Sequence, residues 1–192
     1  MHTIFDEVDY GPLAQLLGKW IGTKGIDKAP DSDAQDDLNE YTDELTFSLA
    51  GPAENAEEQE LVALRYHHLV RKNENGLTFH DQIGHWIYEP STGLVMHSLT
   101  IPRGVCVFAG GTYDDCDGIA TFRVSAEIGS DSYGIIQSPF MLEKARTTSF
   151  RMTMKVKGNT LSYKEVTMLR IYGKDFTHSD QSTLHKVSYD LD

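Results

Sequence analysis

Short β-type runs separated by turn signals follow one another along most of this chain. Many short strands at such spacing predict an antiparallel barrel or sandwich. One connection contains Asn75-Gly76, which is a strong hairpin signal. The runs that we expect to be strands span residues 41–49, 60–71, 77–88, 94–100, 104–108, 118–127, 149–157, 161–172 and 184–191.

The run over residues 149–157 shows the clearest alternation. Its even-numbered side chains are apolar and its odd-numbered ones are polar; the apolar set is Phe150, Met152, Met154 and Val156. A period of two predicts an antiparallel strand with one face packed and the other in water.

Roughly ten strands in meander order would leave a flat sheet with unprotected edges. Closure into a barrel removes those edges and creates an interior. We therefore expect an all-β chain folded as a single antiparallel up-and-down β-barrel domain over residues 1–192, with a short helical segment at 12–17. A length of 192 residues agrees with one domain.

The run Gly18-Lys19-Trp20-Ile21-Gly22 comes directly after that helical segment. Glycines permit close approach where a strand bends, and the Trp supplies a large apolar plug. A buried indole N–H needs a hydrogen-bond partner. We expect Trp20 to close the floor of the barrel.

The distribution of charge along the chain limits the kinds of partner that this protein can bind. The net charge is −12, and residues 26–60 hold twelve acidic residues against the single base Lys28. Such a surface repels nucleic acid, and its spacing lacks the glycine and terminal Glu of an EF-hand loop. We interpret 26–60 as a solvated, partly mobile insertion, and 128–144 and 173–183 as long loops.

The sequence also predicts where the protein is located. It has no apolar run long enough to span a membrane and no signal-like N-terminus, so a cytoplasmic location is expected, with Cys106 and Cys116 reduced.

Of the eight histidines, His185 stands out because it shares a strand face with Val187, Tyr189 and Leu191. That alternation predicts an inward imidazole, which must find a partner, stay neutral or bind something. One histidine in apolar surroundings suits an axial haem ligand better than a zinc site. His80 and Gln82 share a face with Trp86 and could form a polar lid or a distal element. For the remaining histidines a hydrogen-bonded structural role is favoured.

Several segments resemble the nitrobindin-like family of haem-binding β-barrels, which are related in shape to fatty-acid-binding proteins and lipocalins. The matching segments are Gly18-Lys19-Trp20-Ile21-Gly22, His80-Asp81-Gln82-Ile83-Gly84-His85-Trp86, Thr92-Gly93-Leu94, Ile101-Pro102-Arg103-Gly104-Val105 and Gly111-Thr112-Tyr113.

The resemblance implies ferric haem b held by one histidine of the C-terminal strand, nitric oxide binding and peroxynitrite isomerisation. On this chain it implies His185 as the axial ligand of the iron, with His178 in the preceding loop as the alternative. It also implies His80 on the distal side and Met168, Gln82 and Trp20 around the cofactor.

Two other readings stay open. The barrel could be a non-enzymatic carrier of a small apolar ligand such as a fatty acid, using the face of Phe150 and Met152. It could instead be an interaction module with a filled interior and the acidic segment 26–60 as its functional surface. A homodimer is compatible with each reading.

Overall fold

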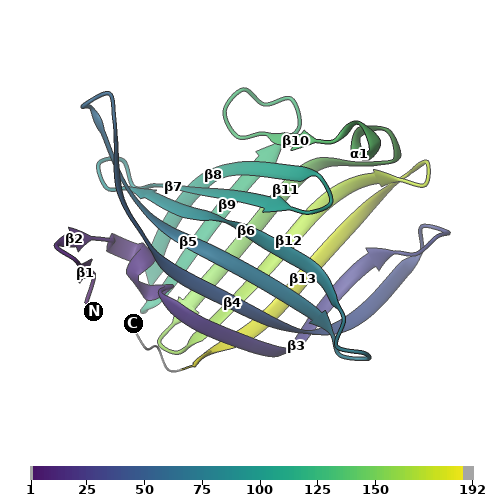
Figure 1. Ribbon diagram of the computed structural model, residues 1–192, viewed down its shortest axis with the longest axis horizontal. Helices are drawn as coiled ribbons and strands as arrows, with labels where there is room; N and C mark the ends of the chain where they lie inside the picture. The colour runs from purple at the N-terminus through teal and green to yellow at the C-terminus, as the bar shows by residue number, and fades with distance from the viewer. Residues whose placement is uncertain (1, 188–192) are drawn as a thin grey trace.

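Ten antiparallel strands follow one another around a closed barrel (Figure 1). This computed structural model describes residues 2–187. Each barrel strand pairs with the next barrel strand along the chain, and β9 is followed in the barrel by β11 because β10 pairs with β8 instead. The barrel closes where β13 pairs with β3. The barrel strands are β3 (Gly18–Pro30), β4 (Asp36–Asn55), β5 (Gln59–Lys72), β6 (Thr78–Glu89), β7 (Leu94–Ile101), β8 (Val105–Cys116), β9 (Ile119–Glu127), β11 (Ala145–Lys157), β12 (Thr160–Ile171) and β13 (Lys174–Val187). The expected up-and-down barrel is confirmed.

Short elements flank the barrel. Strands β1 (Ile4–Phe5) and β2 (Val8–Asp9) form a small hairpin, and the 3-10 helix η1 (Gly11–Gln15) leads into β3. Strand β10 (Ile135–Gln137) pairs with β8, and helix α1 (Pro139–Lys144) precedes β11. No helix within residues 2–187 has the length and hydropathy needed to cross a membrane.

One end of the barrel is closed by aromatic side chains. Trp20 is fully buried, and its indole Nε1 donates a hydrogen bond to the Leu16 carbonyl at 2.7 Å. Trp86, Phe47 and Phe122 are buried with it. The expected role of Trp20 as a floor plug is confirmed, with its polar atom satisfied by the backbone beside η1.

The predicted alternation on β11 is also confirmed. Phe150, Met152, Met154 and Val156 are all buried, whereas Arg151 and Lys155 between them are exposed. Burial of a fully enclosed side chain of this kind stabilises the fold by about 1.5–3 kcal/mol. The alternation therefore identifies the interior face of this strand correctly.

Two of the three segments expected to be irregular are mostly strand. The acidic segment 26–60 is not an insertion, because it contains the end of β3, all of β4 and the start of β5. Residues 173–183 belong largely to β13, whereas 128–144 form a connection that holds only the short β10 and α1. Charge misled the prediction because acidic side chains on the outer face of a strand are as well solvated as those in a loop.

A β-bulge in β3 decides which residues of that strand face inward. The register with β4 shifts between Gly22 and Gly25. The inward side chains are therefore even-numbered before the bulge, as at Trp20, and odd-numbered after it, as at Asp27. A Cβ at Gly25 would lie 2.0 Å from the Tyr41 ring, so only glycine fits there. The bulge thus turns a carboxylate into the barrel.

Candidate ligand-binding cavity

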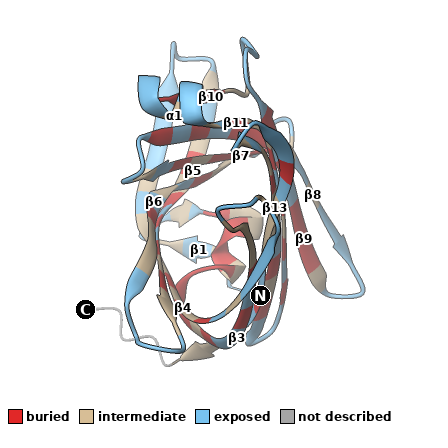
Figure 2. Ribbon diagram, turned by 90° about the vertical axis from the view of Figure 1, so that its right-hand side faces the viewer, coloured by how far each residue is buried: buried red, intermediate tan, exposed pale blue. Residues whose placement is uncertain are grey.

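The open half of the barrel encloses a cavity of about 530 Å³. The same strands that fill the closed end line this cavity with their other halves. On β12, for example, Leu161 lies in the packed core, whereas Tyr163, Glu165 and Thr167 line the cavity. Figure 2 looks into the barrel and shows buried segments on the walls of its interior. A volume of this size is typical of small-molecule sites.

The wall of the cavity is divided into two sides. Strands β7, β8 and β11 and the far end of β12 provide an apolar side that includes Leu99, Ile101, Val105, Val107, Phe150 and Leu169. Strands β3, β4, β5, β6, β13 and the middle of β12 provide a polar side that includes Asp27, Tyr41, His68, His80, Glu165 and Asp180. The arrangement suits a molecule with one apolar and one polar end.

A hydrogen-bonded network around Asp43 separates the cavity from the packed core. The Asp43 carboxylate is fully buried and accepts hydrogen bonds from Ser182 Oγ at 2.9 Å and Tyr163 Oη at 3.1 Å. His68 Nε2 lies 3.3 Å from the same carboxylate, and Tyr41 Oη lies 2.8 Å from Tyr163 Oη. Each member has a partner, so this network rigidifies the floor.

A second network runs from the cavity to the core. His80 Nε2 lies 3.0 Å from Gln82 Oε1, and Gln82 Nε2 donates to Tyr66 Oη at 2.6 Å. His97 Nε2 lies 2.9 Å from the same hydroxyl. Burial lowers the pKa of His80 to about 4 and that of His97 to about 3. Both imidazoles are therefore neutral at pH 7, and an amide oxygen can only accept, so His80 Nε2 carries the proton.

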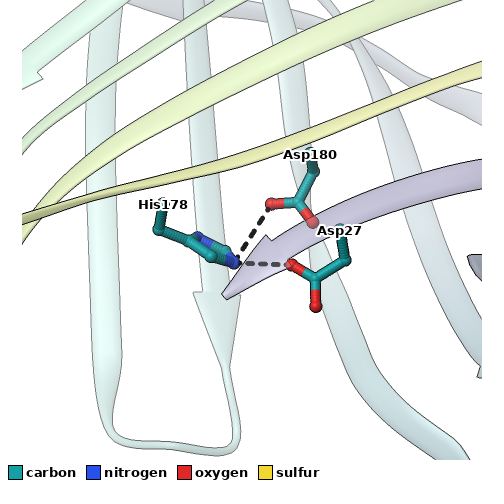
Figure 3. A group of neighbouring side chains, drawn as sticks. All are labelled: Asp27, His178 and Asp180. Carbon is teal, nitrogen blue, oxygen red and sulfur yellow. Dashed lines mark hydrogen bonds and ion pairs between the residues drawn. The ribbon is translucent and has the colours of Figure 1, made fainter. Parts of the chain in front are cut away.

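His178 has the opposite electrostatic environment (Figure 3). Its Nε2 donates to Asp27 Oδ1 at 2.8 Å and lies 3.6 Å from Asp180 Oδ2. Burial disfavours the charged imidazolium, but the hydrogen bond to Asp27 and the charges of Asp180, Asp27 and Glu165 outweigh it and raise the pKa of His178 to about 9. At neutral pH this imidazole is a cation held by carboxylates.

The predicted orientation of His185 is wrong. Its side chain is exposed on the outer surface, because the inward residues of β13 are Phe176, His178, Asp180, Ser182 and Leu184. The prediction assumed that the apolar face of this strand is the inner one. At this end of β13 that assumption fails, because the inward positions are buried Leu184 and then Lys186, whose Nζ lies 4.9 Å from the centroid of the Trp20 ring. Tyr189 and Leu191, which supported the prediction, lie outside the described residues.

The other predicted site residues divide into two groups. His80 and Gln82 line the cavity, as does His178, the alternative to His185. Met168 does not line it, because the inward residues of β12 are the odd-numbered ones, and Trp20 lies in the closed end.

The sequence interpretation missed Asp27, Glu165 and Asp180 as cavity residues. A weak signal was available, since His178, Asp180 and Ser182 alternate on β13.

Comparisons with known proteins agree with this architecture. Residues 9–186 match the model of the THAP4-like, heme-binding beta-barrel domain family. No curated protein matches the chain significantly. Among solved structures, the crystal structure of Rv2717c from M. tuberculosis superposes with a TM-score of 0.67 at 24% identity, over 92% of this chain and 95% of that one. At that identity the structural likeness supports the fold alone.

Proposed function

Because the chain belongs to the THAP4-like family of haem-binding β-barrel domains, we propose that it binds one small amphipathic molecule inside the barrel. The family and the enclosed cavity together make this a small-ligand-binding barrel. The observation that carries the proposal is the division of the 530 Å³ cavity into an apolar and a polar side. The apolar body of the ligand lies against β7, β8 and β11, and its polar end faces β13 and β3.

The apolar side supplies most of the affinity. Leu99, Val105, Val107 and Phe150 are buried, and they present carbon surface to the cavity. Each 100 Å² of apolar ligand surface removed from water contributes about 2.5 kcal/mol. The polar side then orients the ligand, because a buried polar group without a partner is costly.

Haem is the group that the family name implies, and the donors of this cavity do not fit an axial haem ligand. His185 faces solvent, and Asp27 Oδ1 lies 2.8 Å from His178 Nε2, where the plane of a haem bound through this nitrogen would have to lie. His80 donates its Nε2 proton to Gln82, so its lone pair is on Nδ1, the ring nitrogen next to the backbone. Nitric oxide binding and peroxynitrite isomerisation, which the nitrobindin resemblance implies, would both need that iron, so no reaction step is proposed.

Two neighbouring substitutions on β12 test ligand binding. Leu169 faces the cavity and Arg170 faces solvent, so Leu169→Trp fills the cavity whereas Arg170→Trp adds the same ring outside. We expect Nile red to bind the wild type and Arg170→Trp equally, and to bind Leu169→Trp at least about tenfold more weakly, which is about 1.4 kcal/mol. Equal binding by all three proteins would place the dye outside the barrel and overturn the proposal.

A hemin titration of the wild type, His80→Ala and His178→Ala tests the conclusion that no histidine of the cavity is placed to bind haem iron. We expect no Soret band typical of histidine-ligated iron. A sharp band at one equivalent that disappears in His80→Ala or His178→Ala would show that the imidazole rearranges to bind iron, and the conclusion about the donors would be wrong.

A further inference from the structure

Three carboxylates lie side by side on the inner face of three neighbouring strands. Asp180 of β13 is directly opposite Asp27 of β3 on one side and Glu165 of β12 on the other. Directly opposed residues of an antiparallel pair have Cβ atoms about 4.5–5.5 Å apart, and like charges in that position destabilise the sheet. A row of this kind conflicts with folding unless something positive binds to it.

The protein itself supplies little positive charge to this row. Within residues 2–187, no Lys or Arg forms an ion pair with any of the three carboxylates. Lys28 is next to Asp27 in sequence but pairs with Asp36, at 2.8 Å. In the described part of the chain His178 is the one cation in contact with the row, so three ionised carboxylates would exceed it by two charges. Buried charges in proteins are paired or coordinate metals.

The positions of the donor atoms suit a metal ion. The Nε2 of His178 is 2.8 Å from Asp27 Oδ1 and 3.6 Å from Asp180 Oδ2, and donor atoms of all three residues lie within 4.8 Å of one another (Figure 3). Two donors bound tetrahedrally to one ion at about 2.0–2.1 Å are roughly 3.3 Å apart. The observed separations bracket that value, so small side-chain movements would let all three bind one ion.

We infer that Asp27, His178 and Asp180 bind one divalent transition-metal ion in the cavity, with Glu165 beside them as a further oxygen donor. One imidazole with carboxylates suits Mn²⁺, Fe²⁺ or Zn²⁺, whereas Mg²⁺ and Ca²⁺ prefer sites made of oxygen alone. The ion would replace the proton of His178 and offset the surplus negative charge. The cavity side of the ion stays open, so a ligand or water can take the remaining position.

The affinity of this site for a metal ion should rise with pH, because carboxylate and imidazole ligands must be deprotonated before they bind.

Calorimetric titration of EDTA-treated, dialysed protein with ZnCl₂ and with MnCl₂ tests the inference. We expect one equivalent to bind the wild type, with MgCl₂ and CaCl₂ binding much more weakly. Asp180→Asn and His178→Gln replace a carboxylate and an imidazole by neutral amides, which are weaker ligands, so each should weaken Zn²⁺ binding by at least about 100-fold, the upper end of what loss of an outer-shell partner costs. Metal content by mass spectrometry and a thermal melt of each variant confirm the stoichiometry and the fold.

The matched control is His67→Gln. His67 Nε2 lies 2.8 Å from Asp81 Oδ1 on the outer surface, where both side chains are about half exposed. This variant should bind metal as the wild type does. The inference would be overturned if the wild type bound neither Zn²⁺ nor Mn²⁺ at micromolar concentration. It would also be overturned if folded Asp180→Asn and His178→Gln bound Zn²⁺ as tightly as the wild type does. Nile red binding in the same samples reports separately on the amphipathic ligand.

Discussion

The closed end and the open end of the barrel each bury a histidine, and the two imidazoles have opposite charge. His97 stacks on Trp86 with ring centroids 4.4 Å apart, and burial lowers its pKa to about 3. His178 has carboxylates around it, which overcome burial and raise its pKa to about 9. Desolvation favours the neutral form at both positions, so the neighbouring charges alone decide the difference.

The comparison separates a structural half from a ligand-binding half. In the closed end every large side chain packs against another, and the polar atoms are few. In the open end the inward positions of β3, β12 and β13 become polar, and a cavity replaces the core. Like charges gather where their repulsion lowers stability, which is typical of sites that bind something.

The largest expected effect is on packing. Trp86→Ala should lower the free energy of unfolding by about 3–5 kcal/mol, because it opens a void among fully buried rings. Phe79→Ala, on the half-buried rim of the cavity, should cost about 1–2 kcal/mol, since space already exists beside it. Urea unfolding at pH 7 measures both. Equal losses would erase the distinction between the two ends.

Alkaline pH should weaken the open end. The folded pKa of His178, about 9, exceeds the unfolded value of about 6.5, so its contribution is complete below pH 6.5 and is lost as pH rises through 9. Metal-free protein should lose about 2–3 kcal/mol between pH 6.5 and 9, measured by urea unfolding in EDTA. His178→Gln should show a flatter profile. A wild-type stability that is constant over this range would contradict the assigned charge.

Acid should weaken the closed end. The folded pKa of His97 lies below the unfolded value, so its contribution is complete above pH 6.5 and is lost as pH falls towards 3. Between pH 6.5 and 5 the loss should be about 2 kcal/mol from this residue, at roughly 1.4 kcal/mol per pH unit. His97→Gln should reduce the slope, whereas His67→Gln on the outer surface should leave this acid loss in place. Identical slopes in all three proteins would argue against a neutral His97.

The smallest expected effect is a gain in stability, whereas most substitutions lower it. Because its surroundings disfavour ionised Asp180, as its raised pKa indicates, Asp180→Asn should stabilise metal-free protein at pH 8 by about 1 kcal/mol. With added ZnCl₂ the wild type should become more stable than Asp180→Asn, since only the wild type gains from binding. Thermal melts with and without Zn²⁺ measure this. A less stable Asp180→Asn without metal would show that the row of carboxylates is not under repulsion.

Local patterns were sufficient for the barrel and for part of the cavity. Alternation on β11 identified buried Phe150 and Met152, and His80 with Gln82 was correctly assigned to one inward face. The same reasoning failed for His185, because it equates the apolar face with the inner one. At the end of the barrel that equation fails, because the inward position after Leu184 is taken by Lys186, whose Nζ lies over the Trp20 ring, while His185 and Val187 face outward.

The cluster at the centre of the open end was beyond local patterns. Asp27 lies near the start of the chain, and Glu165 and Asp180 lie near its end. They become neighbours only because β13 closes the barrel against β3, and because the bulge at Gly22 and Gly25 turns Asp27 inward. By itself the sequence determined an antiparallel barrel plugged by Trp20, since periodicity and turn chemistry act between residues close in the chain. Barrel closure and strand register are long-range, so only the tertiary structure decided which charges face each other inside it.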